Sequence, residues 1–282
     1  MDLNGAKTVL IIAFLLLNIF LGYQLWQQDG ASQFAYFKRE GEQPRLESAL
    51  EEAGFKMNIS LPRGAMRLSH LYVEPVNLPR QELLDYFFPH SKELVFQKKE
   101  QAVHYLQGNK RLTIDPSKAI SFQLNVERVE TEITKEKAME LASEFLALIS
   151  DTVQLKEDYQ VKLEEGWHLH YSQEFNGFPI FSSYLHIVAA GEKIISTELY
   201  LLNPLNFSGQ EREIIPVSTA LIRFLEEYAK DARGREIIQI NLGFYSPHYE
   251  AERWEIPPVW RILLNSGEVF YINAFTGHLE GR

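Results

Sequence analysis

The sequence has no cysteine among its 282 residues. Disulfide bonds, thiolate catalysis and zinc sites built on cysteine are therefore excluded. Positive charge is also scarce, because 38 acidic residues outnumber 28 lysines and arginines and give a net charge of −10. This balance argues against nucleic acid, anionic lipid surfaces and phosphate-rich polymers as main partners. Electrostatics favours a protein partner or none.

Familiar catalytic motifs are missing as well. The chain contains no Gly-x-Ser-x-Gly, no His-Glu-x-x-His, no phosphate-binding loop and no dinucleotide fingerprint. Pairs of adjacent acids point in diverging directions on regular elements, and we interpret them as solvated. These pairs are Glu51 with Glu52, Glu164 with Glu165, and Glu226 with Glu227. We predict that the protein is not an enzyme and has no catalytic residues and no cofactor.

Two groups of side chains could still form a site. His168 and His170 stand two apart in a predicted strand and share one face, with His186 as a conceivable third metal ligand. A solvated or pairing face explains the same pattern, and on that interpretation there is no metal site. Trp254 and Trp260 flank a proline pair and could line a peptide groove, although buried aromatic side chains are the default interpretation.

What the chain does have is a long apolar run over residues 8–26. At about 1.5 Å per residue a helix here reaches roughly 28 Å, close to the ~30 Å hydrocarbon core of a bilayer. Tyr23 and Trp26 suit the far interface. The run predicts a transmembrane helix. A cleaved signal peptide is the alternative, since residues 30–32 are small, but the run exceeds the usual ~7–15-residue apolar core of such a peptide.

The flanking charges predict the orientation. Lys7 and the free amino terminus precede the run, and Asp29 is the nearest charge beyond it. The positive-inside bias therefore places a leader, residues 1–7, in the cytoplasm. Residues 27–282 are expected outside the cytoplasm, beginning with a polar stalk over residues 27–43. An exported protein without cystine must be stabilised by its core, which is more common in bacterial envelopes.

Apolar patterning predicts an α+β region of antiparallel sheets with packed helices, divided into domains at 44–127 and 128–282. In the first domain a helix ends at Gly54, and Asn77 is expected to cap a second helix that ends at Pro89. Alternating apolar residues predict the strands, which cover residues 55–61, 68–76, 94–97, 103–106, 112–114 and 120–126.

The second domain contains the clearest helix of the sequence. It follows Thr134, a candidate cap, and its core face includes Leu141, Phe145 and Leu146. Strands are expected at 159–163, 167–171, 178–188 and 193–202, with a tight hairpin at Asn176-Gly177. A helix from Pro216 and strands at 237–245, 259–264 and 269–273 repeat this order. Residues 131–203 and 216–282 thus form a weak internal repeat, and the short hairpins favour antiparallel sheets.

The predicted membrane helix also carries the best candidate for partner binding. Asn18 lies near its centre, where the amide gains by hydrogen-bonding another helix, and Gly22 one turn later allows a neighbour to approach closely. The alternative is that Asn18 bonds its own helix backbone. We predict that Asn18 and Gly22 form a helix-packing face.

Several segments together carry a resemblance to a known family. They are the span centred on Asn18, residues 134–142, residues 175–180 and residues 258–277. These segments resemble the YycI family over nearly the whole chain. The resemblance implies a membrane-anchored, non-enzymatic accessory regulator of the sensor histidine kinase WalK (YycG), which controls cell-wall metabolism in low-GC Gram-positive bacteria. It also implies a YycH-like protein as a second partner.

The end of the chain leaves a second interpretation open. Residues 267–277, Gly-Glu-Val-Phe-Tyr-Ile-Asn-Ala-Phe-Thr-Gly, also resemble the strand and turn that end PepSY-type modules. An envelope binding module, or an inhibitor of a secreted protease, is therefore the alternative function.

Overall fold

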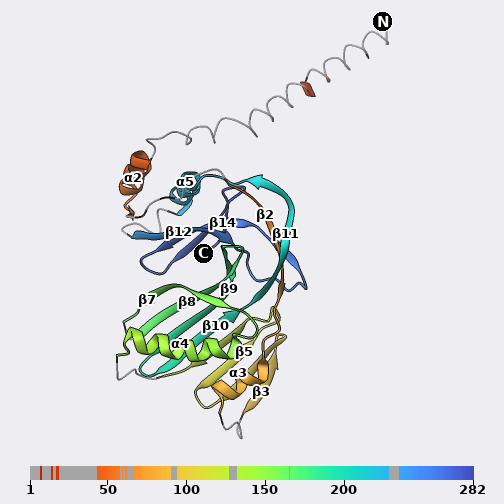
Figure 1. Cartoon of the computed structure of the whole chain (residues 1–282), viewed down its shortest axis with the longest axis vertical. Helices are drawn as coiled ribbons and strands as arrows, with labels where there is room; N and C mark the ends of the chain where they lie inside the picture. Colours follow the sequence, from red (N-terminus) through yellow and green to blue (C-terminus); the bar gives the residue numbers. More distant parts are fainter. Residues whose placement is uncertain are drawn as a thin grey trace.

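The structure is a computed structural model, and it describes residues 7, 14, 17, 18, 43–57, 59, 61, 66–89, 94–126, 132–164, 166–228 and 235–282. The described chain is a mixed α+β protein, mostly antiparallel sheet with few helices, as the sequence predicted. Beyond the amino-terminal residues its helices are α2 (Gln43–Glu52), α3 (Arg80–Phe87), α4 (Lys135–Ile149) and α5 (Val217–Tyr228) (Figure 1).

The amino-terminal predictions fall largely outside the described residues. This applies to most of the predicted span 8–26, including Gly22, and to stalk residues 27–42. Lys7, Phe14, Leu17 and Asn18 are described, and they are helical and exposed. Of the helices that the structure describes, none is both long and apolar enough to cross a membrane.

Most strands of the described chain belong to one sheet of thirteen strands. Its main path runs β16-β15-β14-β12-β9-β10-β6-β5-β4-β3, while β8 joins β9, β7 joins β8 and β1 joins β12. The strands are β1 (Lys56–Met57), β3 (Val95–Lys99), β4 (Ala102–Gln107), β5 (Lys110–Ile114), β6 (Ile120–Leu124), β7 (Leu155–Lys162), β8 (Gly166–Phe175), β9 (Phe178–Ala190), β10 (Lys193–Tyr200), β12 (Glu236–Phe244), β14 (Pro258–Leu264), β15 (Val269–Asn273) and β16 (Leu279–Gly281).

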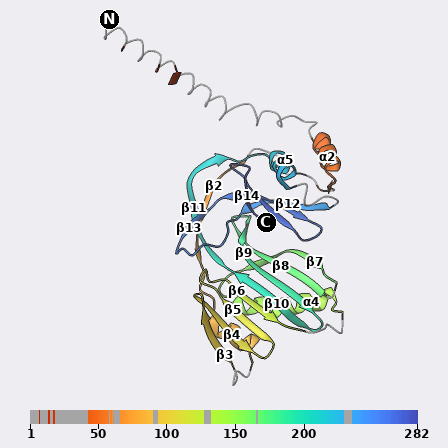
Figure 2. The ribbon, with the colours of Figure 1, turned by 180° about the vertical axis from the view of Figure 1, so that it is seen from behind.

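A second sheet has three strands, in the order β11 (Leu202–Glu213), β2 (Arg67–Pro75) and β13 (Trp254–Ile256). Strands β2 and β11 run side by side as long curved arrows along one side of the molecule (Figure 2). The sequence did not predict β11, because most of its side chains are exposed and no apolar alternation marks it. Strand β11 is stabilised instead by its antiparallel backbone pairing with β2.

Strand pairings between segments far apart in the sequence join the two halves of the chain. Strand β6 pairs with β10, β2 with β11, and β1 with β12, so the predicted boundary between 44–127 and 128–282 runs through continuous sheets. Two pairings are parallel, β1 with β12 and β12 with β9 at Phe244 and Ile180, and depart from the predicted antiparallel pattern. Hairpin signals specify only strands that follow one another, which is why the sequence did not indicate these contacts.

Local signals succeeded where a capping group or turn residue decides the backbone. Thr134 caps α4 by accepting a hydrogen bond from the Lys137 backbone N–H at 3.3 Å. Asn176 and Gly177 form the predicted hairpin, with φ of 49° and 83°. The prediction that Asn77 caps α3 is wrong, because the cap position is Pro79. A residue before proline is disfavoured in the helical region, so the helix cannot start at Leu78.

Helix α4 covers one face of strands β8 and β9. It lies across β8 and β9 (Figure 1), and its side chains Ala142, Phe145 and Ile149 are buried against Leu185 and Ile187. The predicted core residues Leu141 and Leu146 are only partly buried beside this cluster. Because side chains alternate along a strand, the next residues of β8 and β9 point to the opposite face. That face carries the candidate site.

Candidate functional site

A row of polar side chains crosses four neighbouring strands on the face opposite α4. The strand register pairs Tyr159 of β7 with His170 of β8, His170 with His186 of β9, and His186 with Glu198 of β10. His168 lies two residues before His170 and therefore points to the same face. Strands β8, β9 and β10 are each paired on both sides, whereas β7 pairs only with β8 among the described strands, so the histidines and Glu198 stand on backbone that is held from two sides.

The row forms part of the wall of a pocket of about 700 Å³. Strands β7 to β10 form one side, and the opposite side comes from β14, β15 and the segment after β12. The pocket is rich in aromatic rings and holds four histidines. Its lining residues include Tyr159, His168, His170, Tyr171, Tyr184, His186, Glu198, Tyr245, His248, Arg261 and Tyr271. We call it the aromatic pocket.

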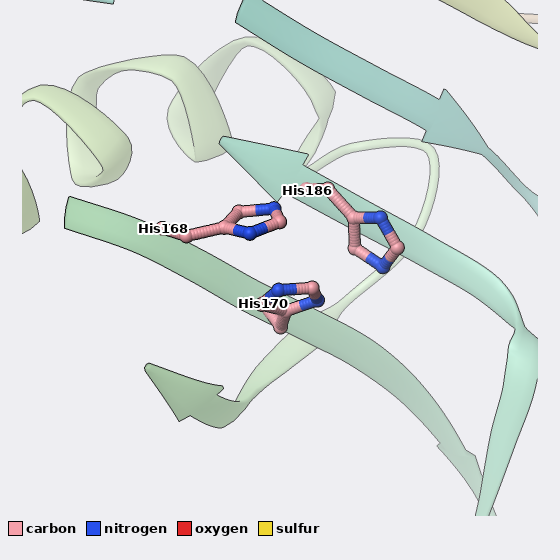
Figure 3. Close-up of side chains that lie close together, drawn as sticks. All are labelled: His168, His170 and His186. Carbon is pink, nitrogen blue, oxygen red and sulfur yellow. The ribbon is translucent and has the colours of Figure 1, made fainter. Parts of the chain in front are cut away.

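The three histidines that the sequence singled out lie close together, as Figure 3 shows, and all three line this pocket. One potential ligand nitrogen from each of His168, His170 and His186 lies within 4.8 Å of the others. The ring centre of His170 is 3.9 Å from that of His168 and 4.2 Å from that of His186. We call these residues the histidine triad. His170 and His186 pair across strands, and His170 is only 6% exposed, so the expected solvated face does not extend to His170.

Burial keeps the triad uncharged. It lowers the pKa of His168 and His170 below the usual value and lowers the pKa of His186 to about 3, with neighbouring histidines adding to the shifts at His170 and His186. All three imidazoles are therefore neutral near pH 7, which is the form that binds a metal ion. The His170 Nδ1 atom is buried and has no hydrogen-bond partner among the residues that the structure describes. Such an atom lacks the interaction that buried polar groups normally make.

A carboxylate adjoins the triad on the side of β10. The Tyr184 hydroxyl donates a hydrogen bond of 2.6 Å to Glu198 Oε1 and lies 3.3 Å from His248 Nε2. The other oxygen, Glu198 Oε2, is 4.0 Å from His186 Nδ1. Burial and the nearby Glu198 raise the pKa of Tyr184, so its hydroxyl keeps its proton and remains a donor.

A buried ion pair borders the opposite side of the pocket. Arg261 of β14 is 1% exposed, and its guanidinium donates two hydrogen bonds to the Asp158 carboxylate and a third, of 3.1 Å, to Gln239 Oε1. The guanidinium carbon also lies 4.2 Å from the centre of the Phe181 ring. This pair was not predicted from the sequence. Its signal was a single arginine in a strand whose other residues are all apolar, Pro-Val-Trp-Arg-Ile-Leu-Leu.

The remaining sequence candidates lie away from the pocket. Trp260 is buried, and its Nε1–H donates to the Ile215 carbonyl at 2.9 Å, so its role is in the core. Trp254 is half-buried and donates to Ser246 Oγ. The described acids of the three pairs are exposed, as expected for solvated faces: Glu51, Glu52, Glu164, Glu226 and Glu227. Glu165 lies outside the described residues.

Comparison with known proteins identifies the family. The family model described as "YycI protein" matches residues 41–275, which is most of the chain. The chain belongs to the YycI family. This confirms the resemblance seen in the sequence. No curated protein matches this YycI-family chain.

Two solved structures resemble this YycI-family chain in fold. An uncharacterized protein from Eubacterium rectale has a TM-score of 0.51 at 14% identity, covering 80% of this chain and 89% of its own. YycH from Bacillus subtilis has a TM-score of 0.51 at 15% identity, covering 83% of this chain and 62% of its own. At these identities the likeness concerns the fold. This chain and YycH from Bacillus subtilis therefore share a fold over the matched region.

Proposed function

We propose that this chain is a non-enzymatic accessory regulator of a sensor histidine kinase of the WalK (YycG) type, which controls cell-wall metabolism. Membership of the YycI family, over residues 41–275, is the observation that carries the proposal. The family and its YycH-like relatives are regulatory accessory proteins of this kinase system. A YycH-like protein is accordingly the second partner we propose.

The proposed location is the cell membrane, crossed once near the amino terminus. The apolar run 8–26 supports this placement, with residues 1–7 in the cytoplasm and the described body beyond residue 43 outside it. In this arrangement the protein contacts the kinase in two places. The membrane helix packs against kinase helices within the bilayer, and the folded body contacts the extracytoplasmic part of the kinase.

Regulation requires that these contacts differ between the signalling states of the kinase. A regulator changes an equilibrium only by the difference between its interaction energies with the two states. Asn18 and Gly22 are the residues we assign to the membrane contact, since an amide can hydrogen-bond across helices and a glycine permits close approach. The large sheet, which spans the folded body and is packed against two hydrophobic clusters, holds that body as a stiff unit above the helix.

The membrane contact can be tested with the double variant Asn18→Leu, Gly22→Leu. Both changes make the segment more apolar, so insertion should survive, while the hydrogen bond is lost and close approach is blocked. Regulation of the kinase, measured from its target genes, should be lost, so that kinase output approaches that of a deletion strain. Protein accumulation and folding of the body should remain normal.

The control is Leu16→Phe, which adds bulk to the same helix about 160° around its axis from Asn18. This variant should regulate like the wild type, because the added bulk points away from the proposed face. The membrane contact is refuted if the double variant regulates normally while the body released from its anchor also keeps its activity. In that case the functional contact lies outside the bilayer.

A further inference from the structure

We propose that the histidine triad, His168, His170 and His186, binds one divalent transition-metal ion of the Zn²⁺ type in the aromatic pocket. Three nitrogen ligands from two adjacent strands converge (Figure 3), within 4.8 Å of one another. They line a pocket of about 700 Å³. This inference does not depend on the role in kinase regulation. It concerns a site that lies far along the chain from the predicted membrane helix.

The backbone gives the triad its convergence. His170 and His186 are directly paired residues of β8 and β9, and His168 precedes His170 at the adjacent position on the same face. Zinc–nitrogen bonds of about 2.0–2.1 Å bring the ligand atoms of a tetrahedral site to roughly 3.4 Å from one another. Modest rotations of the imidazoles close the remaining gap. Ligands carried on central strands need no movement of the backbone to bind.

The chemistry of the ligands selects the class of ion. Imidazole nitrogen suits Zn²⁺, Cu²⁺ and Ni²⁺, whereas Mg²⁺ and Ca²⁺ prefer oxygen ligands. A metal bound through His170 Nδ1 would also provide a partner for the buried nitrogen that has none among the described residues. Metal binding would therefore give the ion the nitrogen ligands that it prefers and give His170 Nδ1 a partner.

The surroundings supply what metal-binding histidines usually have, a carboxylate beside the ligands. Glu198 Oε2 lies 4.0 Å from His186 Nδ1, and the Tyr184 hydroxyl holds the other oxygen at 2.6 Å. A hydrogen bond from His186 Nδ1–H to this carboxylate, which would form if the 4.0 Å distance shortened, would orient the imidazole and raise its basicity. Three protein ligands leave a fourth position open towards the pocket, where a water molecule or a donor atom of a small ligand completes the coordination.

The test is a titration of the full chain, purified in detergent without a histidine tag and freed of metal with a chelator, with ZnCl₂ alone. We expect saturable binding of one Zn²⁺ per chain, unaffected by an excess of Mg²⁺. His168→Gln, His170→Gln and His186→Gln should each weaken binding by more than the roughly 10–100-fold that follows loss of an outer carboxylate partner. Co²⁺ in place of Zn²⁺ should give visible absorption bands that disappear in these variants.

The matched control is His278→Gln, which removes an exposed histidine in the turn between β15 and β16. It should leave Zn²⁺ affinity and the Co²⁺ bands unchanged. Circular dichroism identifies any triad variant that does not fold, and the half-exposed His168 is the variant expected to fold best. The proposal is overturned if the wild type shows no saturable site. It is also overturned if folded His168→Gln and His186→Gln bind Zn²⁺ as tightly as the wild type.

Discussion

Replacing Asp158 with asparagine should lower the free energy of unfolding by about 3–5 kcal/mol. Arg261 is 1% exposed and the Asp158 side chain 11% exposed, so the two charges interact away from water. Asparagine has a similar shape but no charge, and it would leave the buried guanidinium without a compensating carboxylate. Urea unfolding of a fragment that begins at residue 43 measures the loss.

The control for this prediction is the double variant Asp158→Asn, Arg261→Met. Removing both charges of a buried pair is often nearly neutral, because the cost of burying them is removed as well. The double variant should therefore recover most of the stability that the single change loses. A loss below about 1 kcal/mol for Asp158→Asn alone would mean that water or another group satisfies Arg261.

Replacing Phe145 with alanine should cost about 3–5 kcal/mol, because the ring is deleted from a packed cluster and leaves a cavity. Phe145 is 1% exposed, and its ring centre lies 5.4 Å from that of Tyr86 and 5.5 Å from that of Phe87. These partners belong to α3, so the substitution also weakens the contact between α3 and α4. Urea unfolding of the same fragment provides the measurement.

Glu144→Ala is the control on the same helix. Glu144 is exposed, and a change there should alter stability by less than about 0.5 kcal/mol. If Phe145→Ala also cost under about 1 kcal/mol, α4 would not pack on the sheet as described. The comparison therefore separates loss of core packing from a general effect of alanine on the helix.

The parts of the fold that the sequence predicted are those decided by local chemistry. Helix α4 has a strong apolar periodicity and a capping threonine, and the hairpin at Asn176-Gly177 has residues that tolerate positive φ. Strand β11 and the parallel pairings of β12 were not predicted, because distant strands and backbone hydrogen bonds determine them. Of these pairings, β2 with β11 and β1 with β12 also join the two predicted domains.

In the candidate site, too, the sequence predicted what local geometry decides and not what distant strands decide. Alternation along a strand correctly placed His168 and His170 on one face, since a period of two follows from backbone geometry. Sequence alone could not give the register that sets His170 opposite His186, or the fold that closes a pocket over them. Arg261 was overlooked because its buried partner Asp158 lies 103 residues away. Asn18 and Gly22 remain a prediction.

Recovery of partner proteins with the full chain tests the central claim most directly. The chain is captured from a detergent extract of its own membranes, and the co-purified proteins are identified by mass spectrometry. The account predicts a sensor histidine kinase of the WalK (YycG) type, recovered in smaller amount with the Asn18→Leu, Gly22→Leu variant. Recovery of a secreted protease with no kinase, from membranes that contain the kinase, would contradict it.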